Sequence, residues 1–383
     1  MVFQRQGWRY FAMRLDGDTG VETLIDPDLP LESVTISPAL SGDSTISAKI
    51  DPAFRRLQAS DGTPLLHEWS TTIYAECDGE IRCGGILKDT KIDGPTLTLD
   101  IPGFTHYGRD QPYTGSGYKG IQIDALDAVR TIWTHLQAQP GANIGLELSQ
   151  KDSGVKIGTA LTSAEYDGQA GYTTYESGPF KLNWYESLDL QGIVDDLAEE
   201  TPFDYVERHY WDGETIRHVL DFFVPKAGRR RTDLKFWYGT NIFEPEKYSR
   251  NGDEFATGIH VLGAGEGSAM AHYLYQPPSR PQDRLRRITT VQDDSLKSKT
   301  SLTTRAKAEY QWRSRLGDVD DIVVIDHPMA PLGSAQLGDE ILLEGMSDWG
   351  PISIWVRITG MSYQPENGKV ASYSIERADK MAD

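Results

Sequence analysis

Short segments in which apolar and polar residues alternate recur along this chain of 383 residues, and they restrict its possible folds. A period of two, with β-branched and aromatic residues, is typical of strands. Turn residues separate the segments at regular intervals, which predicts a small β-barrel or sandwich for residues 1–107. The segments in this range are Trp8–Leu15, Val34–Pro38, Ser44–Ile50, Thr71–Glu76, Ile81–Leu87 and Thr96–Ile101.

Both cysteines of the chain, Cys77 and Cys83, flank the turn signal Asp78-Gly79. If this dipeptide forms a two-residue turn, Cys77 pairs with Glu80 and Cys83 falls opposite Tyr74. The two thiols are then out of register for a disulfide. We expect free, buried or half-buried thiols rather than a redox pair or a metal site, and synthesis in a reducing cytoplasm.

Helical periodicity appears in residues 108–232. The segment Asp124–Gln137 places Leu126, Val129, Trp133 and Leu136 on one stripe, and Asp124 can cap its start. Residues 149–180 are rich in Gly, Ser, Thr and Tyr, and we expect an ordered excursion or a mobile loop there. The other elements expected in this range are a helix at Leu188–Glu200 and a hairpin of Phe203–Glu207 with Ile216–Val224.

The stretch from Phe236 to Gly267 continues an apolar strand in which Leu234, Phe236 and Tyr238 share one face and Lys235 and Trp237 share the other. A turn at residues 239–241 and a second strand follow. Beyond this stretch we expect a third helix at Thr300–Leu316 and a return to strands over 319–383. Those strands are Ile322–Ile325, Glu340–Leu343, Ile352–Ile358 and Val370–Glu376.

The order of these pieces resembles the baseplate-hub minor tail proteins of long-tailed bacteriophages (siphoviruses). The likeness covers residues 180–383, and for the first half it depends on domain order alone. The residues that carry it are Gly239, Asn241, Ile242, Ala256, Thr257, Ile259, Val261, Gly263 and Gly265, followed by Leu337, Gly338 and Asp339 at the step into a later strand.

The resemblance implies a mainly β protein with an α+β insertion. It would comprise two β-barrel-like hub domains, an α/β domain and a closing barrel. We place an N-terminal barrel at 1–107, an α/β insertion at 108–232, a second barrel-like domain at 233–317 and a small closing barrel at 318–383. In relatives, lytic or receptor-binding domains often follow the hub. Because this chain ends at Asp383, we expect no such domain here.

The resemblance also implies a structural role in the virion, at the tail tip or baseplate, after assembly in the host cytoplasm. Hub proteins of this family form homotrimers that match a sixfold tail tube to a threefold tip and let DNA pass without binding it specifically. The expected partners are the distal tail protein ring, the tape measure protein and other minor tail proteins, with host-envelope contact made through them. No catalytic residue, cofactor or metal is expected.

Composition agrees with that role. The net charge is −19, with 57 acidic against 38 basic side chains, which argues against a surface that grips phosphates. An acidic lumen would instead repel passing DNA. The N-terminus shows no signal peptide, and apolar runs stay too short for a membrane span.

Several local patterns resemble parts of binding or catalytic sites, but each also has an ordinary structural explanation. Gly263–Gly267 follows a strand, but Ser268 stands where the third glycine of a dinucleotide loop would lie and no helical stripe follows, so a tight turn is favoured. Gly42-Asp43-Ser44 resembles a lipase nucleophile without a suitable partner histidine. His67-Glu68 lacks the second histidine of a zinc protease.

Clusters of charge and of aromatic residues are also ambiguous. Residues 195–200 carry four acids, for which a solvated helix face is expected, and the Arg229–Arg231 run is expected to form salt bridges. Tryptophans such as Trp69, Trp237 and Trp355 could form a sugar platform, but core packing is the ordinary use. The rival functions are therefore a carbohydrate-binding or cell-wall-hydrolysing tail enzyme and a bacterial adhesion module. An enzyme would need two carboxylates about 5 to 9.5 Å apart across a cleft.

Overall fold

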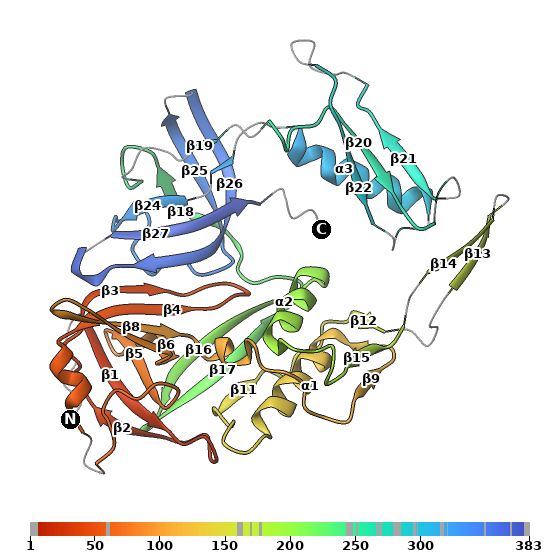
Figure 1. The fold of residues 1–383 in the computed structure, drawn as a ribbon. Coiled ribbons are helices and arrows are strands. Elements are labelled where there is room, and N and C mark those ends of the chain that lie inside the picture. Colours follow the sequence, from red (N-terminus) through yellow and green to blue (C-terminus); the bar gives the residue numbers. More distant parts are fainter. Residues whose placement is uncertain are drawn as a thin grey trace.

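The computed structural model shows a mainly β molecule with three α-helices among the residues it describes (Figure 1). These residues are 7–58, 62–158, 164–168, 171–175, 178–242, 248–249, 252–265, 267, 270–278, 285–293, 296, 298–314, 318–319, 321–347, 350–367 and 370–378. The predicted mainly β class with helical segments is confirmed. No helix in these ranges is both long and apolar enough to cross a membrane.

The N-terminal region contains two facing sheets. The first is antiparallel, in the order β2-β1-β5-β6, and the second contains β3, β4, β8 and β7. Apolar residues from both sheets form one core between them. The strands are β1 (Trp8–Leu15), β2 (Glu22–Asp26), β3 (Glu32–Ser37), β4 (Thr45–Ile50), β5 (Thr71–Cys77), β6 (Glu80–Ile86), β7 (Asp89–Asp93) and β8 (Thr96–Pro102), with short helical turns η1 (Pro52–Arg56) and η2 (Phe104–Gly108).

The middle of the first sheet is buried on both faces, since consecutive residues of its central strands are buried at 11–13 on β1 and at 71–75 on β5. On β1, Ala12 faces the second sheet, whereas Phe11 and Met13 face a layer that comes later in the chain. Successive side chains of a strand point to opposite faces, so a strand inside three layers must be apolar on both. Residues 1–107 therefore pack against the following region through a continuous core.

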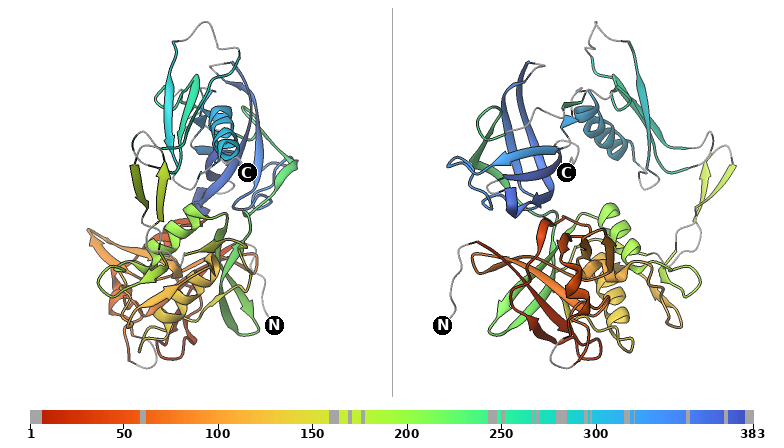
Figure 2. Two further views of the ribbon diagram at one scale, coloured as in Figure 1. Left: turned by 90° about the vertical axis from the view of Figure 1, so that its right-hand side faces the viewer. Right: turned by 60° about the vertical axis from the view of Figure 1, so that its left-hand side comes forward.

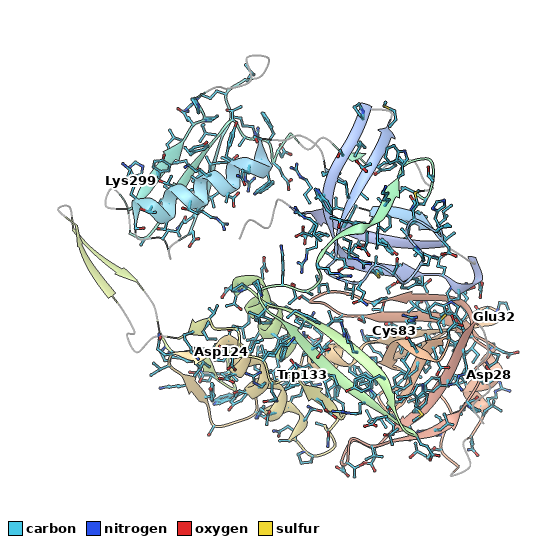
Figure 3. All side chains as sticks on the ribbon, turned by 180° about the vertical axis from the view of Figure 1, so that it is seen from behind. Asp28, Glu32, Cys83, Asp124, Trp133 and Lys299 are labelled. Carbon is cyan, nitrogen blue, oxygen red and sulfur yellow. The ribbon has the colours of Figure 1, made fainter. Side chains whose placement is uncertain are left out.

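That third layer contains α1 (Ala125–Gln137), α2 (Leu190–Glu200) and the long hairpin of β16 (Asp204–Asp212) and β17 (Thr215–Phe223). The Asp124 side chain accepts a hydrogen bond from Leu126 N and caps α1, as predicted, and Trp133 is buried in the core (Figure 3). The shorter strands are β9 (Tyr118–Gly120), β10 (Ile123–Asp124), β11 (Leu146–Leu148), β12 (Lys156–Ile157), β13 (Ala164–Gly168), β14 (Gly171–Tyr175) and β15 (Phe180–Leu182).

The C-terminal half forms two further units, which stand apart in Figures 1 and 2. In one, α3 packs on the sheet β21-β20-β22 around the buried residues Ile259, Val261 and Leu302. In the other, β18, β25, β26, β27 and β24 enclose a separate core. The elements are β18 (Arg230–Trp237), β19 (Tyr248–Ser249), β20 (Gly258–Leu262), β21 (His272–Tyr275), β22 (Ile288–Gln292), α3 (Lys299–Arg313), β23 (Asp318–Val319), β24 (Asp321–Ile325), β25 (Glu340–Ser347), β26 (Gly350–Tyr363), η4 (Pro365–Asn367) and β27 (Val370–Arg377).

One sheet connects the two ends of the chain. Its order is β18-β25-β26-β3-β4-β8-β7, and β26 meets β3 at the pair Tyr363 and Ile36. The four ranges predicted as domains remain a prediction, but strand pairing crosses the boundary at 317/318. Strand β18 pairs in parallel with β25, so that Phe236 lies opposite Leu343. The unit that contains α3 lies between these two strands in the sequence.

Two local predictions need correction. Cys77 pairs with Glu80 as expected, but a bulge at Ala75 and Glu76 places Cys83 opposite Ala75 rather than Tyr74. The extra residue shifts the register by one, and both thiols are free. Tryptophan burial is the second correction, because Trp69 and Trp237 are 51% and 46% exposed.

Candidate functional site

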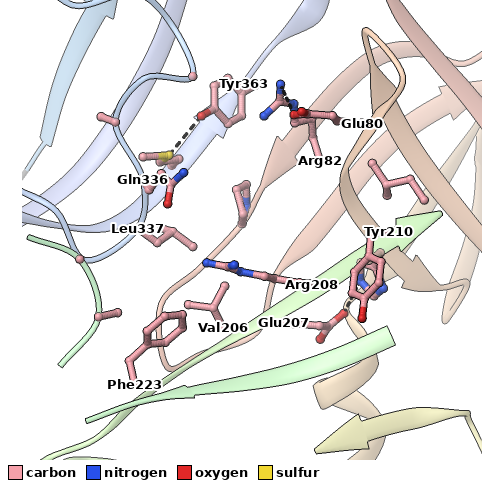
Figure 4. Close-up of a pocket in the computed structure, with 18 residues that line it drawn as sticks. Glu80, Arg82, Val206, Glu207, Arg208, Tyr210, Phe223, Gln336, Leu337 and Tyr363 are labelled. Atoms are coloured by element: carbon pink, nitrogen blue, oxygen red, sulfur yellow. Dashed lines mark hydrogen bonds and ion pairs between the residues drawn. The ribbon is translucent and has the colours of Figure 1, made fainter. Parts of the chain in front are cut away.

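A groove separates the N-terminal sheets from the C-terminal strand unit (Figure 4). Its larger cavity, of about 440 Å³, is lined by β6, β16 and the loop 333–337. A second cavity of about 300 Å³ is lined by Trp8, Cys77 and Pro365, among others. The two cavities share Arg82, Gly333 and Tyr363, so they lie next to each other.

Both arginines that line the groove are paired with acidic side chains. Arg82 lies 2.8 Å from Glu80, and Arg208 lies 3.5 Å from Asp221. Burial raises the pKa of Tyr363, which keeps its phenol neutral. Among the described residues no three His, Cys, Asp or Glu side chains converge on a possible metal position. Polar and apolar side chains both line the groove.

A buried arginine connects the two sides behind the groove. The Arg357 side chain, on β26, is only 2% exposed and forms an ion pair with Asp204 at the start of β16. Its Nε donates to the Gly338 carbonyl at 3.3 Å, and its Nη2 donates to the Ala227 carbonyl at 3.3 Å. This set, the Arg357 joint, links the hairpin layer to the C-terminal strands.

The predicted motif residues Gly338 and Asp339 belong to the same junction. The backbone at Gly338 has φ +86°, and a Cβ there would lie 2.6 Å from the carbonyl carbon of Ala227. The Asp339 carboxylate accepts hydrogen bonds from Arg229 N at 3.0 Å, Arg231 Nη1 at 2.8 Å and Gln336 N at 3.0 Å. These contacts fix the connection between β17 and β18 onto the turn before β25.

The arginine run at 229–231 forms salt bridges, as predicted. Hydrogen bonds to Asp233 and then Asp339 raise the pKa of Arg231, although burial opposes the shift. Arg230 binds Glu340 at 2.8 Å. Burial alone would raise the pKa of Glu340, but Lys226 and Arg230 outweigh burial and lower it. The sequence has a second basic cluster, for which salt bridges were also expected: Arg280, Arg284, Arg286 and Arg287. Of these, Arg280 and Arg284 lie outside the described residues.

The predicted residues Gly239, Asn241 and Ile242 lie together at the end of β18. Gly239 adopts φ +76° in the turn, and Ile242 is buried in the C-terminal core. The fully buried Asn241 side chain accepts from Trp237 N at 2.7 Å and donates to the Lys235 carbonyl at 2.8 Å. The amide thereby replaces backbone pairing where the strand turns.

Replacing Asn241 with alanine should lower the free energy of unfolding by about 1–3 kcal/mol, because a buried backbone N–H loses its partner. Chemical denaturation measures the change. The matched control is Asn183→Ala, since the Asn183 amide bonds the exposed Glu186 and its loss should cost well under about 1 kcal/mol. Equal effects of the two substitutions would refute a special role for Asn241.

Gly263 and Gly265, also predicted from the motif, lie elsewhere, after β20 in the unit that contains α3. A Cβ on Gly263 would lie 2.3 Å from the Leu296 carbonyl oxygen, and Gly265 has φ +124°. Both glycines therefore occur where backbone segments approach closely or turn. The motif residues divide among three sites, and of these only Gly338 and Asp339 adjoin the groove.

Of the four acids at 195–200, Asp196, Glu199 and Glu200 are exposed as expected, but Asp195 is not. Asp195 does not face solvent freely, because it pairs with Arg109 at 2.5 Å and accepts from the Tyr205 hydroxyl at 2.5 Å. Asp43 accepts hydrogen bonds from the Arg109 guanidinium and contacts His106 at 2.9 Å. These carboxylates connect α2, β16 and the loop before β4, so their role in the structure is to hold elements together.

Sequence reasoning did not identify Arg357 or Asp204. The available signal was a single charge in the apolar run Trp-Val-Arg-Ile, where Val356 and Ile358 are also buried. Such a charge predicts a buried partner but does not say which of 57 acids supplies it.

Three solved structures resemble this fold over nearly its whole length. The 43 kDa tail protein of prophage MuSo2 from Shewanella oneidensis is 11% identical, with 98% of this chain and 100% of that one covered at a TM-score of 0.56. Prophage tail protein gp18 from Listeria monocytogenes EGD-e is 13% identical, with 97% and 95% covered at 0.55. A tail protein from Neisseria meningitidis MC58 is 14% identical, with 97% of each covered at 0.51. No family model matches the chain, and no curated protein matches it.

Proposed function

We propose that this chain, which has the fold of these phage tail proteins, is a non-enzymatic structural protein of the baseplate hub in the tail of a long-tailed phage. The observation that carries the proposal is the coverage of the comparison. Two tail proteins match more than nine-tenths of both chains at TM-scores of 0.55 and 0.56. The likeness thus involves the sandwich, the helical layer and both C-terminal units together.

A homotrimer is the assembly we propose, with two barrel-like domains per chain in a ring at the tail tip. The groove and the Arg357 joint support a rigid subunit, because buried ion pairs and a continuous sheet connect the two ends of each chain. A ring of rigid subunits can join a sixfold tube to a threefold tip. The distal tail protein ring, the tape measure protein and other minor tail proteins are the proposed neighbours.

Passage of DNA is consistent with the charge of the chain. A net charge of −19 per subunit repels phosphates at short range, and a ring of three subunits multiplies that charge. In the described part of the chain, many of the arginines are paired with acids, as at Arg231 and Arg357. We propose that DNA moves past the hub without being held by it.

The native mass of the purified full-length protein tests the proposal. We expect a particle of three times the 42.7 kDa chain mass, measured by light scattering after size exclusion over a dilution series. Electron microscopy of the same fraction should show a ring with a central channel. A monomer or dimer at every concentration, or a trimer without a channel, would contradict the hub assignment. Release of soluble fragments from peptidoglycan would contradict the non-enzymatic role.

A further inference from the structure

Four buried ionisable side chains form a row between the N-terminal sheet and the β16–β17 hairpin: Glu22, His218, His209 and Glu207. His209 Nε2 lies 2.8 Å from Glu207 Oε1, and His209 Nδ1 lies 2.9 Å from His218 Nδ1. His218 Nε2 lies 3.2 Å from Glu22 Oε2, an ion contact rather than an aligned hydrogen bond. None of the four side chains is more than 4% exposed.

Both carboxylates of this histidine row are held in the ionised form by donors. Burial alone would raise the pKa of Glu22 and of Glu207, but the contact with a histidine and the hydrogen bonds from other donors outweigh burial and lower both pKa values. The further donors are Thr72 Oγ1 and Tyr74 OH to Glu22, and Phe104 N, Thr105 N and Thr105 Oγ1 to Glu207.

The contacts of the four ring nitrogens of His209 and His218 determine how many protons the two rings carry. Each Nε2 faces a carboxylate and therefore carries a proton, because a lone pair there would repel the anion. Between the rings, one Nδ1 must donate and the other must accept. The two imidazoles thus share three protons and one positive charge between two negative charges.

Other groups that face the row cannot absorb a fourth proton near neutral pH. The Cys83 thiol on β6 and the Tyr74 hydroxyl on β5 are already protonated, since burial raises the pKa of each. The Phe104 ring stacks on His218 at 4.3 Å between centroids. Glu147 on β11 also interacts with His218 electrostatically. A fourth proton must therefore enter between the two Nδ1 atoms.

We propose that the histidine row is a proton-controlled joint, which holds the β16–β17 hairpin on the N-terminal sheet at neutral pH and releases it when a fourth proton enters. Two N–H groups cannot face each other at 2.9 Å, and two imidazolium charges repel at that distance. The joint is independent of the function proposed above, since it depends only on these buried groups.

The direction of the effect follows from linkage. Burial first, and the charge of His209, lower the pKa of His218. In the closed state the β16–β17 hairpin is held on the N-terminal sheet, and in the open state it is released. Below about pH 6.5 the open state binds a proton that the closed state does not bind, so the closed state becomes less stable as the pH falls. The lowered pKa values of Glu22 and Glu207 add a second loss of stability, which begins as the pH falls through about 4.5. All three groups therefore favour opening in acid.

Hydrogen–deuterium exchange on the full-length protein tests the joint, with rates corrected for the intrinsic effect of pH. Between about pH 6.5 and 5 we expect the opening constant of the β16–β17 amides to rise up to tenfold per pH unit for each proton taken up. In His218→Gln, which cannot be protonated at that position, most of this response should disappear.

The chain supplies a matched control, because His260 and His272 form an exposed pair 3.5 Å apart on β20 and β21. His272→Gln should leave the response of β16–β17 unchanged, and equal responses in both variants would overturn the proposal. If His218→Gln fails to fold, the ring ¹⁵N spectrum of the wild-type protein decides. Three ring protons on His209 and His218 near pH 7 support the joint, whereas two overturn it.

Discussion

Replacing Arg357 with alanine should destabilise the protein by about 3–5 kcal/mol, because the largely buried Asp204 carboxylate would lose its positively charged partner. The Asp204 carboxylate, whose side chain is only 13% exposed, would lose its ion pair. The carbonyls of Gly338 and Ala227 would lose donors in the same place. Equilibrium denaturation in urea measures the loss, and a single transition shows whether the two ends of the chain still unfold together.

The control for Arg357→Ala is Arg217→Ala. Arg217 also pairs with a carboxylate, that of Glu147, but the two side chains are 41% and 50% exposed. An exposed pair contributes at most about 1 kcal/mol. If the two substitutions cost the same, the Arg357 joint does not hold the units together. Arg357→Lys keeps the charge but loses the planar fork, so we expect an intermediate cost.

Replacing Gly338 with alanine should cost about 3 kcal/mol or more, from two separate penalties. An alanine at φ +86° is strained, and its Cβ would lie 2.6 Å from the carbonyl carbon of Ala227. The facing Gly228 is equally constrained, since a Cβ there would lie 2.0 Å from the carbonyl carbon of Gly338. The two backbones meet so closely that neither position has room for a methyl group.

Gly333→Ala separates the two penalties. Gly333 has φ +84°, and a Cβ there would meet nothing within 4 Å. The left-handed backbone then costs about 1–2 kcal/mol without a clash. Denaturation midpoints of the two variants should therefore differ clearly, with Gly338→Ala much lower. Similar midpoints would show that the backbone at Ala227 can move away from a methyl group at position 338. The close contact between the two segments would then not constrain position 338.

These predictions share a functional consequence. The Arg357 joint and the Gly338 contact both connect the β16–β17 layer to the C-terminal strands, and the groove opens between the same parts. A chain that loses either contact would still contain its separate cores. It would lose the fixed relation between them on which the proposed ring depends.

Sequence patterns predicted individual elements well, because local burial determines them. The alternation at residues 234–238 predicted that Leu234, Phe236 and Tyr238 are buried, and each is at most 8% exposed. The stripe on α1 predicted the burial of Trp133, and the Asp124 cap predicted where that helix begins. Strand β2 and strand β7, with short and half-exposed patterns, were not predicted, since their exposed residues carry little periodic signal.

Register and partners were less predictable. One extra residue on β6, Arg82, moved Cys83 by one position, and nothing local to the Asp78-Gly79 turn indicates that bulge. Among the motif residues, the sequence placed Gly338 and Asp339 before a strand but did not show that they face Ala227 and Arg231. Those contacts join segments more than a hundred residues apart.

The sequence by itself determined which faces are buried, where helices begin and which residues can turn, because periodicity, caps and glycines act over a few neighbours. Only the tertiary structure decided that β18 pairs with β25, that Arg357 meets Asp204 and that His209 meets His218 in the core. An apolar pattern predicts that a face of a strand or helix is buried, but it does not identify the element that packs against that face. The choice of partner is made by packing and charge compensation across the whole chain.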